Sequence, residues 1–270
     1  MKTVLSIQDL SCVGRCSLTV ALPVISAMGI RCSVLPTAVL STHTGFPNPE
    51  VVSLTEYMEA IGRHWESVDI SFDAVTTGYM ADPQQVNAIL PLLRTHKARG
   101  STVIVDPAMG DHGKLYSRLG NDHVPAMAAL CREADILLPN MTEAALLADM
   151  PYRAEADEAY LKALSGQLLS RYDAKAVVIT GVTGTGGTIG FCGCEEQGEF
   201  FSYSTPVIPR QCHGTGDLFS AVFTGSLLRG SSVYQSGAAA ADFVRRCIAA
   251  TDTVSPHGVE FEYQIPHLFV

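Results

Sequence analysis

Residues 74–105, AVTTGYMADPQQVNAILPLLRTHKARGSTVIV, contain the pattern that decides the fold class. The β-branched runs at 74–77 and 102–105 have the composition of buried strands. Between them, Asp82 is a favourable N-cap and Pro83 suits the first helical position, and leucines recur along one face of the residues that follow. The segment therefore predicts a strand, a helix up to about Thr95, and a second strand.

The same alternation extends over most of the chain. Further strand-like runs lie at 3–7, 32–35, 136–138 and 176–180. Strand, helix and strand repeated in this way predict an α/β fold of three layers, with a mostly parallel central sheet covered by helices on both faces. Ligands of such sheets bind at the carboxyl ends of the strands.

Two segments interrupt the alternation. Residues 36–50 are rich in Pro, Thr and Gly and predict a lid, whereas residues 188–208 predict a hairpin at a sheet edge. The chain has no internal repeat and no composition shift typical of a linker. We therefore expect a single domain over residues 1–270.

Composition excludes several function classes. The 270 residues carry a net charge of -9 with only 18 Lys and Arg, so no basic surface is available for nucleic acid. No run approaches the roughly 20 apolar residues of a membrane helix, and no cleavable leader is recognisable. The eight cysteines form no C-x-x-C pair and so indicate no zinc ribbon. These features predict a soluble cytoplasmic protein without nucleic-acid or membrane partners.

The strongest local motif is His213-Gly214-Thr215-Gly216-Asp217, directly before an apolar helical segment. A glycine turn at a helix start exposes backbone N–H groups that can bind the oxygens of a transferring phosphoryl group. Asp217, beside this anion hole, could accept a proton from a substrate hydroxyl. The alternative is an ordinary capped helix start.

Three other turns follow predicted strands. Asp106 and Asp111 enclose one turn, and hard oxygen ligands of this kind suit magnesium. Asn140 and Glu143 are spaced to share a helix face, where they could hold magnesium waters or form a helix cap. The glycine-rich residues 180–187 could contact nucleotide phosphates, although neither a Walker-type loop nor a dinucleotide fingerprint is present.

These motifs together resemble the ribokinase-like superfamily, in which an Asn-x-x-Glu motif, a Thr-Gly-x-x-Gly segment and a terminal Gly-x-Gly-Asp occur in that order. Within it, three segments resemble the pyridoxal and pyridoxamine (vitamin B6) kinases. They are Asp106-Pro-Ala-Met-Gly-Asp111, Ser41-Thr-His-Thr44-Gly and Thr77-Gly-Tyr79. The resemblance runs from Ile7 to about Leu228.

The resemblance implies ATP-dependent phosphorylation of the 5′-hydroxymethyl group of pyridoxal, pyridoxamine or pyridoxine. It makes Asp217 the base, with Gly214, Thr215 and Gly216 as the anion hole. It places Asn140, Glu143, Asp106 and Asp111 near magnesium and the triphosphate, with Asp111 and Glu143 as metal ligands and a monovalent cation such as K⁺ compatible nearby. Thr180, Gly181 and Thr183 would line the nucleotide side, and Thr44 and Tyr79 would contact the pyridine ring.

Two departures from the pattern matter for the substrate. Asp9 stands where many pyridoxal kinases have Ser, and a carboxylate facing the ring nitrogen would favour its protonated form; the alternative is a local cap. Cys212 and His213 precede the glycine turn and would lie on the substrate side, where the thiol could add to the aldehyde of pyridoxal if it were exposed and partly ionised.

Other functions stay open at this stage. His-Gly-Thr-Gly is also typical of hydroxymethylpyrimidine kinases, although those usually follow it with Cys where this chain has Asp217. A hydroxymethylpyrimidine kinase, or a bifunctional kinase that acts on both rings, is therefore the alternative. A non-catalytic B6 carrier would not need the acidic residues. We also expect residues 112–124 to form a lid over the site, and, by the resemblance, a homodimer.

Overall fold

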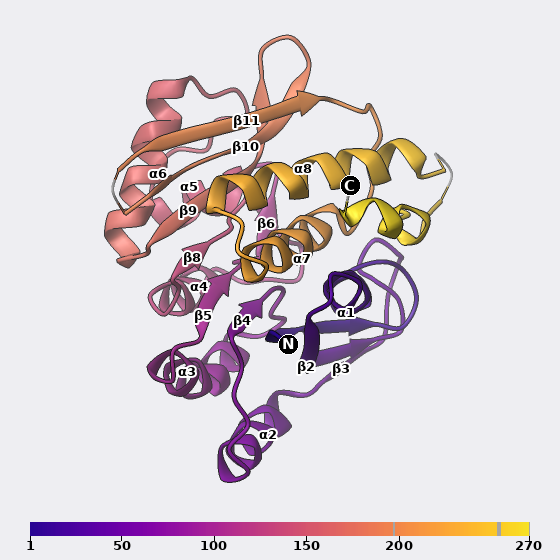
Figure 1. Cartoon of the computed structure of the whole chain (residues 1–270), viewed down its shortest axis with the longest axis vertical. Helices are drawn as coiled ribbons and strands as arrows, with labels where there is room; N and C mark the ends of the chain where they lie inside the picture. The colour runs from indigo at the N-terminus through magenta and orange to yellow at the C-terminus, as the bar shows by residue number, and fades with distance from the viewer. Residues whose placement is uncertain (197, 253–254, 270) are drawn as a thin grey trace.

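The computed structural model describes residues 1–196, 198–252 and 255–269 (Figure 1). One mixed sheet runs through this part of the chain, with nine strands in the order β11-β10-β9-β8-β5-β4-β1-β2-β3. The strands are β1 (Thr3–Ser11), β2 (Arg31–Leu40), β3 (Val51–Ser53), β4 (Ala74–Thr77), β5 (Thr102–Val105), β8 (Ile136–Leu137), β9 (Ala176–Gly184), β10 (Thr188–Glu195) and β11 (Phe200–Pro206). A separate two-stranded ribbon joins β6 (Gly110–Asp111) to β7 (Lys114–Leu115).

The middle of the sheet is parallel. β1 pairs with β2 and β4, and the ladder continues through β5 and β8 to β9. β3 is antiparallel to β2 at one edge, and β10 and β11 form an antiparallel hairpin at the other. Because the six parallel strands all end at one edge of the sheet, their carboxyl-end turns gather there.

Helices cover both faces of the sheet (Figure 1). One face packs against α1 (Leu18–Ala27), α7 (Thr215–Leu228) and α8 (Val233–Ala250). The other packs against α2 (Thr55–Ser67), α3 (Pro83–Ala98), α4 (His123–Cys131), α5 (Met141–Ala148) and α6 (Glu158–Tyr172). The 3₁₀ helix η1 (Glu262–Phe269) follows near the end of the chain.

The alternation of β1 explains the two cores. Val4 belongs to the core under α1, α7 and α8, whereas Leu5 and Ile7 belong to the core on the other face, and all three are fully buried. A strand buried on both faces reads as a nearly continuous apolar run, as this one does. The fold class predicted from the sequence is thus confirmed.

The predictions for individual segments had different outcomes. The helix start is confirmed, because the Asp82 carboxylate accepts a hydrogen bond from the N–H of Gln84. The edge hairpin predicted over 188–208 is confirmed as β10 and β11. The lid predicted over 36–50 is wrong in its first part, because residues 36–40 complete β2 by pairing with β1, and 51–53 then form β3.

The structure also corrects the prediction of a turn in the glycine-rich segment. Thr180, Gly181 and Thr183 lie within β9, because the strand continues to Gly184 by pairing with β10, so the turn comes only after that residue. Residues 112–124 begin in the β6–β7 ribbon and end in the first turn of α4. Within the described residues, no helix has the length and apolar character needed to cross a bilayer.

Candidate active site

Acidic residues gather where the parallel strands end. Asp9 lies near the end of β1, Asp106 directly follows β5, and Asn140 follows β8 as the N-cap of α5. Asp217 comes from a different element, the first turn of α7, which packs on the sheet face shared with α1. The topology therefore brings together Asp9 and Asp217, which are 208 positions apart in the sequence.

The glycine turn before α7 has the geometry of an anion hole. Gly214 is the N-cap with φ of 79°, and a Cβ at this position would lie 2.0 Å from the carbonyl oxygen of Arg15. Only glycine fits such a close approach in the left-handed region. In the described part of the chain, the N–H groups of Thr215, Gly216 and Asp217 donate to no acceptor. They remain available to an anionic ligand.

Asp217 is held by the loop before α1. Its Oδ2 accepts a hydrogen bond of 2.8 Å from the backbone N–H of Ser17. Burial, opposed by this hydrogen bond and assisted by the charge of Asp9, raises the pKa of Asp217 to about 6. A carboxyl with this pKa is ionised at neutral pH and is more basic than an exposed one, as a general base requires.

Asp9 lies on the other side of Ser17. Its Oδ1 accepts 2.6 Å from the Ser17 hydroxyl, and its Oδ2 accepts 3.3 Å from the hydroxyl of Ser11. The side chain is 4% exposed. Burial raises the pKa of Asp9, and the two hydroxyl donors partly offset that rise. Asp9 thus accepts from one hydroxyl two residues away, at Ser11, and from one at Ser17 in the loop before α1.

Asp106 faces α7 from the sheet. Its Oδ2 accepts 2.6 Å from the hydroxyl of Ser220, which lies one turn after Asp217 on the same helix. Burial raises the pKa of Asp106 to about 7, with the Ser220 hydrogen bond lowering it and the charge of Asp217 raising it. Asp217 and Ser220 thus both face the turn that follows β5.

Asn140 and Glu143 form a capping box at the start of α5. Glu143 Oε1 accepts from the N–H groups of Met109 and Gly110 at 3.0 and 3.4 Å, and Oε2 accepts from that of Asn140 at 2.8 Å. Asn140 in turn donates 2.7 Å to the carbonyl of Gly110. This pair therefore fastens the acidic turn to α5. Burial, and then the charge of Asp106, raise the pKa of Glu143.

Asp111 and the β9 residues lie further out. Asp111 is exposed, and its Oδ1 accepts 2.7 Å from the N–H of His112 in the β6–β7 ribbon. Thr180 adjoins the site, because its N–H donates 2.9 Å to the carbonyl of Pro139, next to Asn140. Thr183 donates 2.8 Å to the carbonyl of Ala154.

Charge on the acidic residues indicates a cation. In the described part of the chain, Asp9, Asp106, Glu143 and Asp217 form no ion pair with Lys, Arg or His. The described residues also contain no cluster of three His, Cys, Asp or Glu side chains arranged to hold a metal by themselves. Hard oxygen ligands without a compensating charge fit magnesium that arrives with phosphate oxygens as its other ligands.

A cavity of about 210 Å³ is lined by both residues predicted to contact the pyridine ring. Its lining consists of Leu40, Thr44, Val51, Tyr79, Ala81 and Arg118. Burial and then the charge of Asp9 raise the pKa of Tyr79, whereas the charge of Arg118 lowers it. The Tyr79 hydroxyl therefore lies within reach of a negative and a positive charge. Arg118 is exposed and has no hydrogen bond or ion pair with another described residue.

The two residues before the glycine turn are not among those that line this cavity. Cys212 is partly buried against the core beneath α8, and burial raises the pKa of its thiol, which is therefore not readily ionised. His213 lies with its ring 4.9 Å from that of His43. His43 accepts 3.0 Å from the N–H of Gly45 through Nδ1, and its Nε2 lies 2.9 Å from the carbonyl of Pro256, so it links its own loop to the segment at Pro256.

Three residues of the site were not predicted from the sequence. Ser220 could have been found, because it lies three residues after Asp217 and so on the same helix face. Ser17 and Arg118 carry no such signal, since each reaches the site only through the path of its loop.

Comparison with known proteins gives a consistent result. The family model described as phosphomethylpyrimidine kinase matches residues 22–260. A Bacteroides thetaiotaomicron protein provisionally assigned as a phosphomethylpyrimidine kinase and crystallised with pyridoxal is 33% identical, with a TM-score of 0.94 over 100% of this chain and 96% of that one. Pyridoxal kinase of Lactobacillus plantarum is 32% identical, with a TM-score of 0.90 over 100% and 97%. Pyridoxal kinase PdxY of Burkholderia lata is 29% identical over 256 residues, 86% of this chain and 83% of the relative.

Proposed function

Because the chain belongs to the phosphomethylpyrimidine kinase family, we propose that it transfers the γ-phosphoryl group of ATP to the 5′-hydroxymethyl group of pyridoxal or a related B6 vitamer. The observation that carries the proposal is the pairing of Asp217 with unpartnered N–H groups at the start of α7. A base and an anion hole side by side suit the transfer of a phosphoryl group to an alcohol.

Each part of the site has a task in this reaction. Asp217 orients the substrate hydroxyl and accepts its proton as the phosphoryl group arrives. The N–H groups of Thr215, Gly216 and Asp217 stabilise the charge on the phosphoryl oxygens. Thr180, Gly181 and Thr183 on β9 face the nucleotide side of this arrangement.

Magnesium completes the electrostatics. Asp111, predicted as a ligand, would hold it together with Asp106. Glu143, the other predicted ligand, accepts backbone N–H groups through both carboxylate oxygens and would act with Asn140 through the turn that they fasten. When bound, the metal neutralises phosphate charge. A monovalent cation such as K⁺ near the same carboxylates is part of the proposal.

The cavity lined by Thr44, Tyr79 and Arg118 suits a pyridine ring that carries an acidic hydroxyl. Asp9 would stabilise a protonated ring nitrogen, and Arg118, the one cation among the described residues that line the cavity, would stabilise the ionised ring hydroxyl. Thr44 and Tyr79 would contact the ring. The solved relative that contains pyridoxal, 33% identical to this chain, supports a B6 vitamer as the substrate.

A second candidate is a hydroxymethylpyrimidine kinase, favoured by the description of the matching family model. That ring also presents a primary alcohol, but it has no acidic hydroxyl for Arg118. The two functions therefore predict different effects of replacing Arg118 on substrate binding.

The test is ADP release with Mg·ATP and pyridoxal, pyridoxamine or hydroxymethylpyrimidine in turn. We expect turnover on a B6 vitamer that falls by about 10²–10⁴-fold in Asp217→Asn. Glu66→Gln, which neutralises an exposed carboxylate where α2 leads toward the amino end of β4, is the matched control. Turnover on hydroxymethylpyrimidine alone would favour the second candidate, and binding of pyridoxal without any turnover would indicate a carrier.

A further inference from the structure

We propose that Ser17 is a positioning residue that sets the distance between the ring-facing carboxyl and the catalytic base. Its hydroxyl donates 2.6 Å to Asp9, while its backbone N–H donates 2.8 Å to Asp217. One residue thus binds the two carboxyl groups to which the proposed function assigns the ring and the phosphoryl transfer. The proposal rests on that function.

The backbone of Ser17 is strained. Its φ of 53° and ψ of −125° lie in a region that a residue other than glycine rarely adopts. Such conformations persist only where the surroundings hold them, and they concentrate at functional sites. At Ser17 the restraints are the two carboxyl groups, an antiparallel bridge to Leu10, and the start of α1, whose Val20 and Ala21 N–H groups donate to the Ser17 carbonyl.

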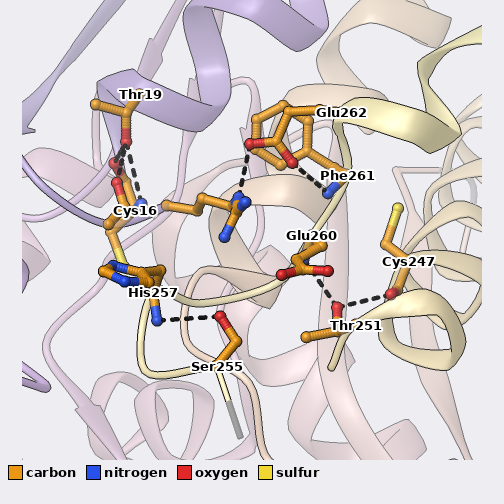
Figure 2. A network of polar contacts seen from close by, with 11 residues as sticks. Cys16, Thr19, Cys247, Thr251, Ser255, His257, Glu260, Phe261 and Glu262 are labelled. Atoms are coloured by element: carbon orange, nitrogen blue, oxygen red, sulfur yellow. Dashed lines mark hydrogen bonds and ion pairs between the residues drawn. The ribbon is translucent and has the colours of Figure 1, made fainter. Parts of the chain in front are cut away.

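The loop before Ser17 is fixed from outside the site (Figure 2). The Thr19 hydroxyl lies 3.0 Å from the carbonyl of Gly14 and 2.7 Å from that of Cys16. Arg15 donates 2.7 Å through its N–H to the carbonyl of His257, and its Nε donates 2.6 Å to Glu262. These contacts keep the peptide of Ser17 from turning away from Asp217.

The two hydrogen bonds of Ser17 predict separate kinetic effects. The hydroxyl bond lowers the pKa of Asp9 against the effect of burial, so it favours the ionised carboxyl that a protonated ring nitrogen needs. The backbone bond holds Asp217 and does not depend on the side chain. Removing only the hydroxyl should therefore weaken ring binding more than it slows the chemical step.

The experiment compares Ser17→Ala and Ser17→Gly with the control Ser26→Ala, an exposed serine on α1. Loss of a hydrogen bond to a charged group predicts a rise of about tenfold in the KM for pyridoxal in Ser17→Ala, with kcat and the KM for ATP changed by less than about threefold. Ser17→Gly also frees the backbone, so its kcat should fall further.

A double variant tests whether Ser17 acts through Asp9. If it does, Asp9→Ser combined with Ser17→Ala should have the same KM for pyridoxal as Asp9→Ser alone. A KM for pyridoxal within twofold of wild type in Ser17→Ala, or an equal rise in both backgrounds, would overturn the proposal. Equal losses of kcat for every substrate, with KM unaltered, would show that Ser17 has only a structural role and would overturn the proposal.

Failure of the proposed function would look different. In that case wild type itself would not phosphorylate pyridoxal, and the coupling would be read from urea unfolding of the ligand-free variants at pH 7. Non-additive effects of Ser17→Ala and Asp9→Ser on the unfolding midpoint would support the link between the two residues, and additive effects would overturn it.

Discussion

Replacing Asp217 by Asn should stabilise the ligand-free protein while it removes the catalytic base. Asn keeps an oxygen that can accept the N–H of Ser17, but it carries no charge. The change therefore isolates the ionisation of this carboxyl. Buried carboxylates serve the activity of a site that binds a cation and phosphate together. When those ligands are absent, the same carboxylates lower the stability of the folded protein.

The pKa of Asp217 gives the magnitude. Its rise from 3.8 to about 6 makes the ionised carboxylate about 3 kcal/mol less favourable in the folded than in the unfolded chain. Because the side chain keeps some exposure to solvent, we expect about 2 kcal/mol of this. Since the folded-state pKa is raised, the penalty is absent below pH 3.8, grows as the pH rises, and is complete above about pH 6.

Thermal unfolding of the ligand-free proteins at pH 4 and pH 8 measures this effect. At pH 8 the Tm of Asp217→Asn should exceed that of wild type by about 4–8 °C, and at pH 4 the two should nearly coincide. Glu66→Gln should follow wild type at both pH values. An equal difference at pH 4 and pH 8, or a less stable variant at pH 8, would refute the ionisation argument.

Three further predictions concern the site. The kcat/KM for pyridoxal should rise with pH and level off above about pH 6, where Asp217 is ionised, and a profile that is flat from pH 5 to 8 would exclude this role. Arg118→Gln should raise the KM for pyridoxal by about tenfold and that for hydroxymethylpyrimidine by less than twofold, as initial rates can measure, whereas equal changes would remove Arg118 from ring recognition. In urea titrations, Gly214→Ala should lower the free energy of unfolding by about 2–4 kcal/mol, because its Cβ would meet the Arg15 carbonyl at positive φ. Gly216→Ala, whose Cβ would enter open space, should change the free energy of unfolding by less than about 1 kcal/mol.

The sequence predicts those parts of the fold that depend on local patterns. The parallel strands and the Asp82–Pro83 helix start were recognisable because burial and capping leave a regular trace in the residues. The extensions of β2 and β9 were not, because pairing with β1 and β10 overrides the turn character of Pro and Gly in those segments.

For the site, the sequence identified residues but not their arrangement. The sequence shows acids beside turns at strand or helix ends, namely Asp217, Asp106 and Glu143. Their hydrogen bonds follow from packing between distant segments: Asp217 bonds to Ser17, Asp106 to Ser220, and Glu143 to the amides at 109–110. Cys212 was assigned to the substrate side from its place before the glycine turn. The direction of its side chain, toward the core, is set by the surroundings of α8 and leaves no trace in the sequence.

The most direct test of the central claim identifies the product. Wild type would be incubated with Mg·ATP and pyridoxal, and the product examined by phosphorus NMR and mass spectrometry. We predict a single phosphate monoester on the 5′-hydroxymethyl oxygen of pyridoxal, formed in equal amount to ADP and absent with Asp217→Asn. Release of ADP and inorganic phosphate without any phosphorylated ring would contradict the account, because the site would then hydrolyse ATP instead of transferring its phosphoryl group to an alcohol.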